Sequence, residues 1–202
     1  MEAAKLQFSE HEMSLVSNAD WILTKNEILN KIGRLLGALN SIQKQLIREM
    51  AAGLPPEITD TTPKISRGEN YKGLPYMVLD YPRLFTRNHI FAVRSLFWWG
   101  NTLSVTLHLS GQWQQFFAGN ILRQYEFSVQ NDFVVATDDD EWAHDVESVG
   151  FIPVKNLLKT DVHQILATKP FFKIALYSPV DELNSGIQIW EQQFKKVLQL
   201  LH

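Results

Sequence analysis

The sequence predicts an α+β fold, in which a mostly antiparallel sheet packs against a long N-terminal helix and a C-terminal amphipathic helix. Apolar residues recur at spacings of three and four in the first third of the chain and again at its end, which is typical of helices with one buried face. In the middle of the chain the apolar period is two, which is typical of strands. These strand segments follow one another instead of alternating with helices, which favours an antiparallel sheet over a doubly wound parallel one.

The length of 202 residues fits a single domain spanning 1–202. Residues 1–53 form its helical part and residues 64–202 its sheet-containing part. A polar segment, residues 54–63, links the two parts and contains prolines and threonines.

Two capping-box patterns, beginning at Ser9 and Thr24, predict two helix starts in the N-terminal part. The second helix ends at Gly53, because two prolines follow. The stripe of apolar residues along this helix is wider than the a/d seam of a heptad repeat, so a core-facing helix is favoured over a parallel coiled coil. The stripe consists of Ile28, Ile32, Leu35, Leu39, Ile42, Leu46 and Met50.

The opposite face of this helix carries Gly33, Gly37 and Ser41, spaced four apart. Exposed glycine weakens a helix, so either another backbone approaches this face closely or the glycines are merely tolerated. We predict a homodimer that uses this helix. The alternative is a monomer in which the C-terminal helix covers the small-residue face through Trp190 and Phe194.

The central hairpin comprises residues 90–98 and 102–109, joined by Gly100 and Asn101, a pair suited to a two-residue turn. If Trp99 pairs with Thr102, alternation places Arg94 on the same face as the apolar residues of the second strand. The other face, which includes His108, is mixed and is expected to line a groove or lie under a helix.

Further strands are expected at residues 75–81, at 125–129 or 133–137, and at 171–177. Short helices are expected at residues 139–146 and 161–168, and the segment 112–118 is ambiguous. The C-terminal helix has Asn184 or Ser185 as its cap. Its stripe consists of Ile187, Trp190, Phe194, Val197, Leu198 and Leu201.

The composition excludes several kinds of chemistry and partner. Without cysteine there is no disulfide, thiolate nucleophile or thiolate-bound zinc. The net charge of −3 provides no general attraction to nucleic acid or to an anionic membrane, and the apolar runs are too short to span a bilayer. The N-terminus lacks the pattern of a signal peptide. We therefore expect a soluble, cytoplasmic protein that binds neither nucleic acid nor membrane and has no cofactor.

Aromatic and basic residues are interleaved between residues 64 and 111, and this block is the best candidate for a site that recognises an anion. Residues 64–73 resemble a polar loop with two glycines, but the spacing is not that of a phosphate-binding loop. The candidate binding residues of the block are Arg67, Tyr71, Tyr76, Asp80, Arg83, Arg94 and His108.

Arg94 is the sharpest candidate in this block. A guanidinium keeps its charge when it is buried, so it requires a carboxylate partner or a bound anion. Asp80 and Glu126 are the internal partners that we expect. An internally paired Arg94 is favoured over one that binds a ligand.

The acidic segment 138–145 contains several carboxylates and an imidazole, but its spacing matches neither a calcium loop nor a zinc-protease helix. A solvated helix start is favoured, and we predict no metal site. Residues 124–154 contain no Lys or Arg, whereas residues 64–94 carry six of them. These two oppositely charged regions are expected to face each other, within one chain or between two.

The sequence leaves two functions open. The favoured one is a non-catalytic binding or interaction protein whose recognition surface is the aromatic and basic block. The alternative is an enzyme acting on a small anionic substrate, which Arg94 and Arg67 bind while His108 or Asp80 transfers a proton. A pocket in which Arg94, His108 and a carboxylate converge without satisfying one another would favour the enzyme, and an internally paired Arg94 would favour binding.

Overall fold

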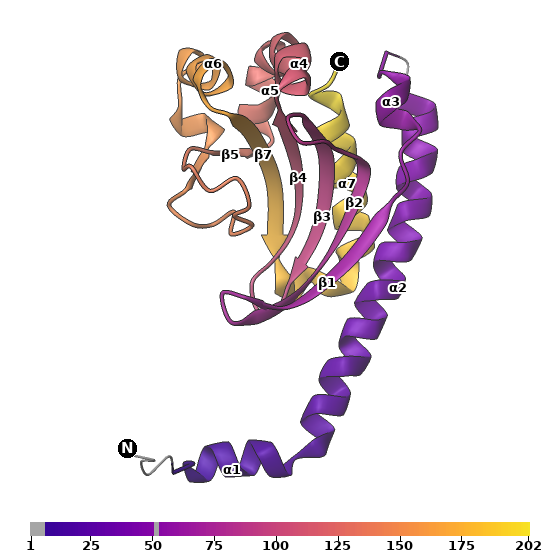
Figure 1. Cartoon of the computed structure of the whole chain (residues 1–202), viewed down its shortest axis with the longest axis vertical. Helices are drawn as coiled ribbons and strands as arrows, with labels where there is room; N and C mark the ends of the chain where they lie inside the picture. Colours follow the sequence, from indigo (N-terminus) through magenta and orange to yellow (C-terminus); the bar gives the residue numbers. More distant parts are fainter. Residues whose placement is uncertain (1–6, 51–52) are drawn as a thin grey trace.

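The computed structural model describes residues 7–50 and 53–202 and confirms the α+β fold (Figure 1). Seven strands form one antiparallel sheet in the order β1-β2-β3-β4-β7-β5-β6. Helices α2 and α7 run beside the sheet, while α4, α5 and α6 gather near one end of it. The strands are β1 (Lys64–Tyr71), β2 (Leu74–Phe85), β3 (Ile90–Trp98), β4 (Thr102–Ser110), β5 (Val134–Ala136), β6 (Phe151–Pro153) and β7 (Phe171–Pro179).

The N-terminal helices are α1 (Glu10–Ser17) and α2 (Ala19–Met50). The predicted capping box of α1 is present, because Ser9 Oγ accepts from the backbone N–H of Glu12 and the Glu12 carboxylate accepts from the backbone N–H of Ser9. The second predicted start, at Thr24, is wrong. The helix is already formed at Ala19, where the Asn18 side chain accepts from a first-turn N–H.

Only the second part of α2 packs on the sheet. Its buried positions begin ten residues after its first residue, whereas α1 and the first turns of α2 extend beyond the sheet (Figure 1). The apolar residues of α2 that recur at spacings of three and four therefore indicate a core-facing helix, as predicted. The buried residues of α2 are Leu29, Ile32, Leu36, Leu39, Gln43, Leu46 and Ile47.

The small-residue face of α2 is not covered by the C-terminal helix. A side chain added at Gly37 would meet no described atom within 4 Å, and one at Gly33 would touch only the Met77 side chain at 3.4 Å. Trp190 and Phe194 are fully buried in the main core instead. The alternative in which these two aromatics cover the glycines is therefore wrong.

The remaining helices are α3 (Pro56–Thr59), α4 (Gln112–Arg123), α5 (Tyr125–Gln130), α6 (Lys159–Thr168) and α7 (Gly186–Gln199), with 3₁₀ turns η1 (Val154–Asn156) and η2 (Val180–Ser185). The ambiguous segment 112–118 belongs to α4. A strand was expected at either residues 125–129 or residues 133–137. Residues 125–129 lie in α5, and β5 lies within 133–137. α6 and α7 confirm the two predicted helices, although the Ser185 side chain makes no capping hydrogen bond.

Two predicted local structures are wrong. Residues 64–73 form strand β1 and its turn instead of a loop, because β1 pairs with β2 along most of its length. Residues 139–146 form no helix. Their backbone groups bond to side chains of β1 and β7, and these bonds replace those that a helix would make.

The hairpin of β3 and β4 has a register one residue different from the predicted one. Phe97 pairs with Leu103, which excludes a pairing of Trp99 with Thr102. Residues 99–101 form a three-residue connection, and Gly100 in it has a φ of 70°, a conformation that favours glycine. A shift of one residue moves every side chain of a strand to the opposite face.

The corrected register changes the neighbours of Arg94. Arg94 pairs with Thr106 and Ala92 pairs with His108, so the predicted apolar surroundings of Arg94 on β4 are wrong. The opposite face is apolar apart from Ser95, which accepts a hydrogen bond from Gln43 of α2, and its apolar residues belong to the same core cluster as α2 and α7. That core face of the hairpin consists of Phe91, Val93, Phe97, Leu103, Val105, Leu107 and Leu109.

Candidate functional site

The face of the sheet turned away from α2 and α7 carries polar and charged side chains beside two small apolar clusters, and we call it the polar face. Strand register places side chains from six neighbouring strands on it, and the alternation that directs leucines into the core directs these residues the other way. The polar face includes Lys64, Ser66, Tyr76, Asp80, Arg94, Thr106, His108, Lys173 and Val134.

The segment between β5 and β6 crosses this polar face, and we call residues 137–150 the strap. Tyr71 Oη accepts hydrogen bonds from the backbone N–H groups of His144 and Asp145, at 2.7 and 3.1 Å. Lys173 Nζ donates to the carbonyl oxygens of Glu141, at 3.1 Å, and Ala143. The strap is therefore held to the sheet at both the β1 and the β7 side.

An ion pair also joins the strap to the basic block. Lys72 Nζ lies 2.6 Å from a carboxylate oxygen of Asp145. The oppositely charged regions thus meet within one chain at this point. This ion pair is largely exposed on the lysine side, so it contributes little to stability compared with the buried bonds.

Arg94 is paired with Asp80 under the edge of the strap. Arg94 Nε and Nη2 donate to the two Asp80 carboxylate oxygens at 2.7 and 3.3 Å. The Arg94 and Asp80 side chains are only 12% and 7% exposed. This confirms the predicted internal pairing and selects Asp80 over Glu126 as the partner.

The guanidinium of Arg94 has further contacts. Its central carbon lies 5.8 Å from the centre of the Phe85 ring and 5.6 Å from that of the Trp142 ring, which are distances of cation–π interactions. Arg94 Nη1 is buried and makes no hydrogen bond within the described chain.

A cavity of about 380 Å³ adjoins Arg94. Three cationic side chains from three strands line it, namely Lys64, Arg83 and Arg94, and Asp80 is the one carboxylate in its described lining. Arg83 Nε donates to a backbone carbonyl at 3.0 Å. Within residues 7–50 and 53–202, neither Lys64 nor Arg83 forms a salt bridge, so the cavity carries excess positive charge.

The pKa values of neighbouring bases reflect this positive environment. Burial, and then the charges of Lys173 and Arg94, lower the pKa of His108 to about 3. Burial, and then the same two cations, lower the pKa of His144 to about 3. Burial, followed by the charge of Arg94, lowers the pKa of Lys173 to about 8. At neutral pH both histidines are therefore uncharged.

His108 lies beneath the strap and is fully buried. Its Nε2 is 3.0 Å from a Glu141 carboxylate oxygen, and its ring centre is 5.5 Å from that of Trp142. Because this histidine is neutral, the contact with Glu141 is a hydrogen bond from Nε2–H and not an ion pair. Burial raises the pKa of Glu141.

The structure brings most of the predicted site residues together. Tyr76, Asp80, Arg83 and Arg94 line the cavity. Tyr71 anchors the strap, and His108 lies on the same sheet face under Trp142 without lining the cavity. Arg67 lies outside it, where its guanidinium pairs with Glu69, which also pairs with Lys25 of α2.

The candidate binding residues named from the sequence did not include six residues of the cavity, although four of the six lie in the block 64–111. The six residues are Lys64, Ser66, Val78, Phe85, Trp142 and His144. The period-two alternation of β1 would have found Lys64 and Ser66 if the segment had been taken as a strand. Trp142 and His144 reach the cavity only because the strap folds over the sheet. No local pattern in the strap signals that position.

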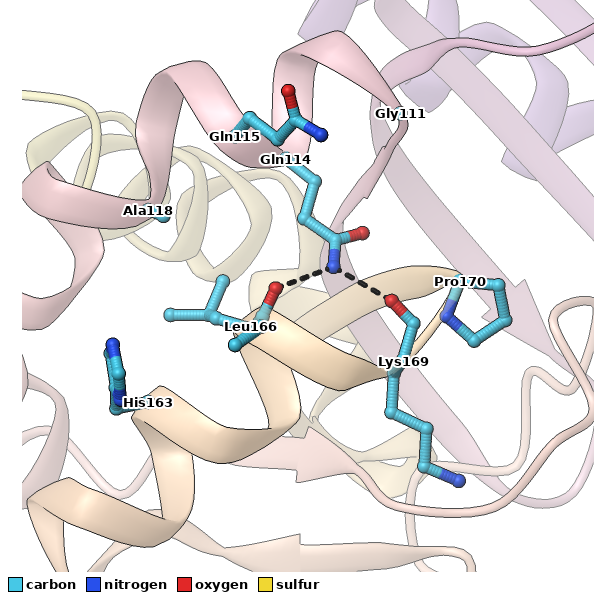
Figure 2. Close-up of a pocket in the computed structure, with 9 residues that line it drawn as sticks. Gly111, Gln114, Gln115, Ala118, His163, Leu166, Lys169 and Pro170 are labelled. Carbon is cyan, nitrogen blue, oxygen red and sulfur yellow. Dashed lines mark hydrogen bonds between the residues drawn. The ribbon is translucent and has the colours of Figure 1, made fainter.

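A second hollow, of about 460 Å³, lies between α4 and α6 (Figure 2). Gln114 Nε2 donates to the carbonyl oxygens of Leu166 and Lys169 at 2.8 and 2.9 Å. These carbonyls end α6, so the buried carboxamide caps the helix. Lys169, the cation in the lining, pairs with Asp139. This hollow therefore has a structural explanation, and its charges are balanced.

Three further observations bear on the assignment of a function. Comparison with protein-family models, with curated proteins and with solved structures found no match to this chain. Within the described residues, no group of three or more His, Asp or Glu side chains is placed to hold a metal ion. No described helix is long and apolar enough to cross a bilayer. The assignment therefore rests on the geometry of the cavity.

Proposed function

We propose that this protein is a non-catalytic binding protein for small organic anions, and that the cavity beside Arg94 is its binding site. The observation that carries the proposal is the convergence of three cations on a cavity with one carboxylate. That carboxylate, on Asp80, already bonds to Arg94. Uncompensated positive charge at a cavity attracts an anion.

Asp80 and His108, the two residues that could transfer a proton, already have hydrogen-bond partners within the chain, and this supports binding over catalysis. Asp80 is bonded to Arg94, and His108 is buried with its Nε2 bonded to Glu141. A general base must reach the proton that it removes from a substrate. His108 does not line the cavity, and both carboxylate oxygens of Asp80 already accept hydrogen bonds from Arg94. Lys64 and Arg83, in contrast, border the cavity with cationic groups that an anion can contact.

The proposal predicts that small aromatic anions bind saturably to the cavity. We expect benzoate, phenyl sulfate or phenyl phosphate to give a binding isotherm in titration calorimetry at pH 7.5. Lys64→Gln and Arg83→Gln each remove one positive charge from the lining and are expected to weaken binding roughly three- to tenfold.

Arg34→Gln is the matched control, because Arg34 is an exposed cation on α2 that does not line the cavity. This variant is expected to bind as the wild type does. If none of the three anions binds, or if Arg34→Gln weakens binding as much as Arg83→Gln does, the cavity is not the anion site.

We also propose that the protein is a homodimer that uses its projecting N-terminal arm, residues 8–27. No residue of this arm is buried, although seven of the 13 exposed large apolar side chains in the described chain belong to it. An exposed apolar surface of this kind is typical of an interaction site. The seven side chains are Phe8, Met13, Leu15, Val16, Trp21, Ile22 and Leu23.

A second copy of the chain is the occupant that we propose for this surface. The exposed fractions of the seven side chains leave several hundred Å² per chain, near the ~800 Å² that each partner buries in a specific interface. A hollow of about 350 Å³ at the base of the arm, lined by Trp21, Ile28 and Trp99 among others, offers a place for apolar residues of the partner. A two-fold contact between arms would bury both copies equally.

The dimer predicts a molecular mass of two chains in light scattering at tens of micromolar protein. Trp21→Glu combined with Leu23→Glu is expected to yield the monomer mass, because two charges would be buried without partners at the contact. Val149→Glu makes the same kind of change at a fully exposed position of the strap and is expected to leave the mass unchanged. A wild-type mass of one chain would disprove the dimer.

A further inference from the structure

We infer that the cavity beside Arg94 selects a doubly charged phosphate group carried on a flat ring, as in an aryl phosphomonoester, over a singly charged anion. This inference rests on the proposed function and specifies the ligand class of the same site. It follows from three features of the cavity, which are its charge, its hydrogen-bond donors and its aromatic walls.

The charge of the cavity matches a dianion. Arg94 and Asp80 neutralise each other through two hydrogen bonds. Lys64 and Arg83 then remain as two positive charges without a carboxylate partner in the described chain. His144 adds no charge at neutral pH, because partial burial and the neighbouring charge of Arg94 lower its pKa to about 3. A carboxylate or sulfate would neutralise one of these two charges, whereas a phosphomonoester at neutral pH carries nearly two.

The polar groups of the lining suit a ligand with several acceptor oxygens. Arg94 lines the cavity with a guanidinium group. Ser66 and Tyr76, which carry hydroxyl groups, lie on adjacent strands and line the same cavity. A phosphate group presents three acceptor oxygens, and its hydrogen bonds to guanidinium are charge-assisted.

The aromatic walls suit a flat organic group attached to the phosphate. Tyr76, Phe85 and Trp142 line the cavity together with the cations. The Phe85 and Trp142 ring centres are 6.4 Å apart, and both rings also line a neighbouring cavity of about 480 Å³. A volume of about 380 Å³ is at the lower end for ligand pockets, which suits one phosphate and one ring of a small molecule.

Titration calorimetry at pH 7.5 with three matched probes tests this inference. Phenyl phosphate carries nearly two charges, whereas phenyl sulfate and phenyl methyl phosphate each carry one on a similar tetrahedral group. We expect phenyl phosphate to bind roughly tenfold or more tightly than either monoanion, because its second charge meets the second unpaired cation.

Charge-removing variants show whether the preference comes from this cavity. In Lys64→Gln or Arg83→Gln one unpaired cation remains, and the preference for phenyl phosphate is expected to fall to roughly threefold or less. Arg34→Gln is expected to keep the full preference. Circular dichroism and thermal melting of each variant confirm that its fold is retained.

The outcomes separate this inference from the proposed function. Equal affinity for the three probes, lost in the Lys64 and Arg83 variants, would overturn the selection of a dianion and leave the anion site standing. A preference for phenyl phosphate that survives both variants would also overturn the inference, because it would arise elsewhere. Absence of binding by every probe would overturn the proposed function itself.

Discussion

Arg94→Ala is expected to destabilise the fold by roughly 3 to 5 kcal/mol, the cost of leaving one member of a buried ion pair without its partner. Asp80 is only 7% exposed at its side chain and accepts two hydrogen bonds from Arg94. The substitution also removes the cation between the Phe85 and Trp142 rings. Urea unfolding followed by tryptophan fluorescence and circular dichroism measures the loss.

A double variant isolates the buried charge as the cause. Asp80→Leu combined with Arg94→Met removes both ions and replaces them with apolar side chains of similar size, and it is expected to recover most of the lost stability. Arg34→Ala removes an exposed arginine and is expected to change stability by less than about 0.5 kcal/mol. An Arg94→Ala variant as stable as the wild type would show that the ion pair does not support the fold.

Acid is expected to unfold this protein through His108, which is buried on the polar face, and His144, which is half-buried on the strap. Burial and the charges of Arg94 and Lys173 hold the pKa values of His108 and His144 at about 3, whereas each imidazole titrates near 6.5 when exposed in the unfolded chain. Between pH 6.5 and 3 the unfolded state therefore binds more protons. The stability gained from neutral histidines is complete above pH 6.5 and is lost as the pH falls towards 3.

Each of these histidines contributes a slope of up to about 1.4 kcal/mol per pH unit in that window. Glu141 acts in the opposite direction, because its pKa is raised by burial and the folded state keeps its proton to higher pH. This partial offset lies above the ordinary pKa of a glutamate. The free energy of unfolding measured in urea at pH 7, 6, 5 and 4 gives the net slope.

Variants of single histidines assign the slope. His144→Gln keeps a side chain of similar polarity without a titrating group, and its stability is expected to depend on pH about half as steeply as that of the wild type. His163→Gln, on the exposed side of α6, is expected to leave the slope unchanged. A His144→Gln profile that matches the wild type would show that this histidine does not govern the acid sensitivity.

Local sequence patterns were sufficient to predict most of the secondary structure. The capping box at Ser9 and the apolar stripe of the long helix depend on residues three and four positions apart, so the chain specifies them without knowledge of the fold. The need of Arg94 for a carboxylate also follows from residue chemistry, and Asp80 was among its expected partners. Four of the predicted binding residues, Tyr76, Asp80, Arg83 and Arg94, line the cavity.

Contacts between distant segments determined what the sequence patterns did not predict. The strap is not helical because its N–H groups bond to Tyr71, 73 residues from His144, and its carbonyls bond to Lys173. The hairpin register depends on how β4 meets both β7 and the helix-covered core, and alternation alone is satisfied equally well one residue away. Because of this difference of one residue, Arg94 lies on the polar face with His108 and not in the predicted apolar surroundings. The free energy of such pairings comes from surfaces that touch only after folding, so residue spacing along the chain does not encode it.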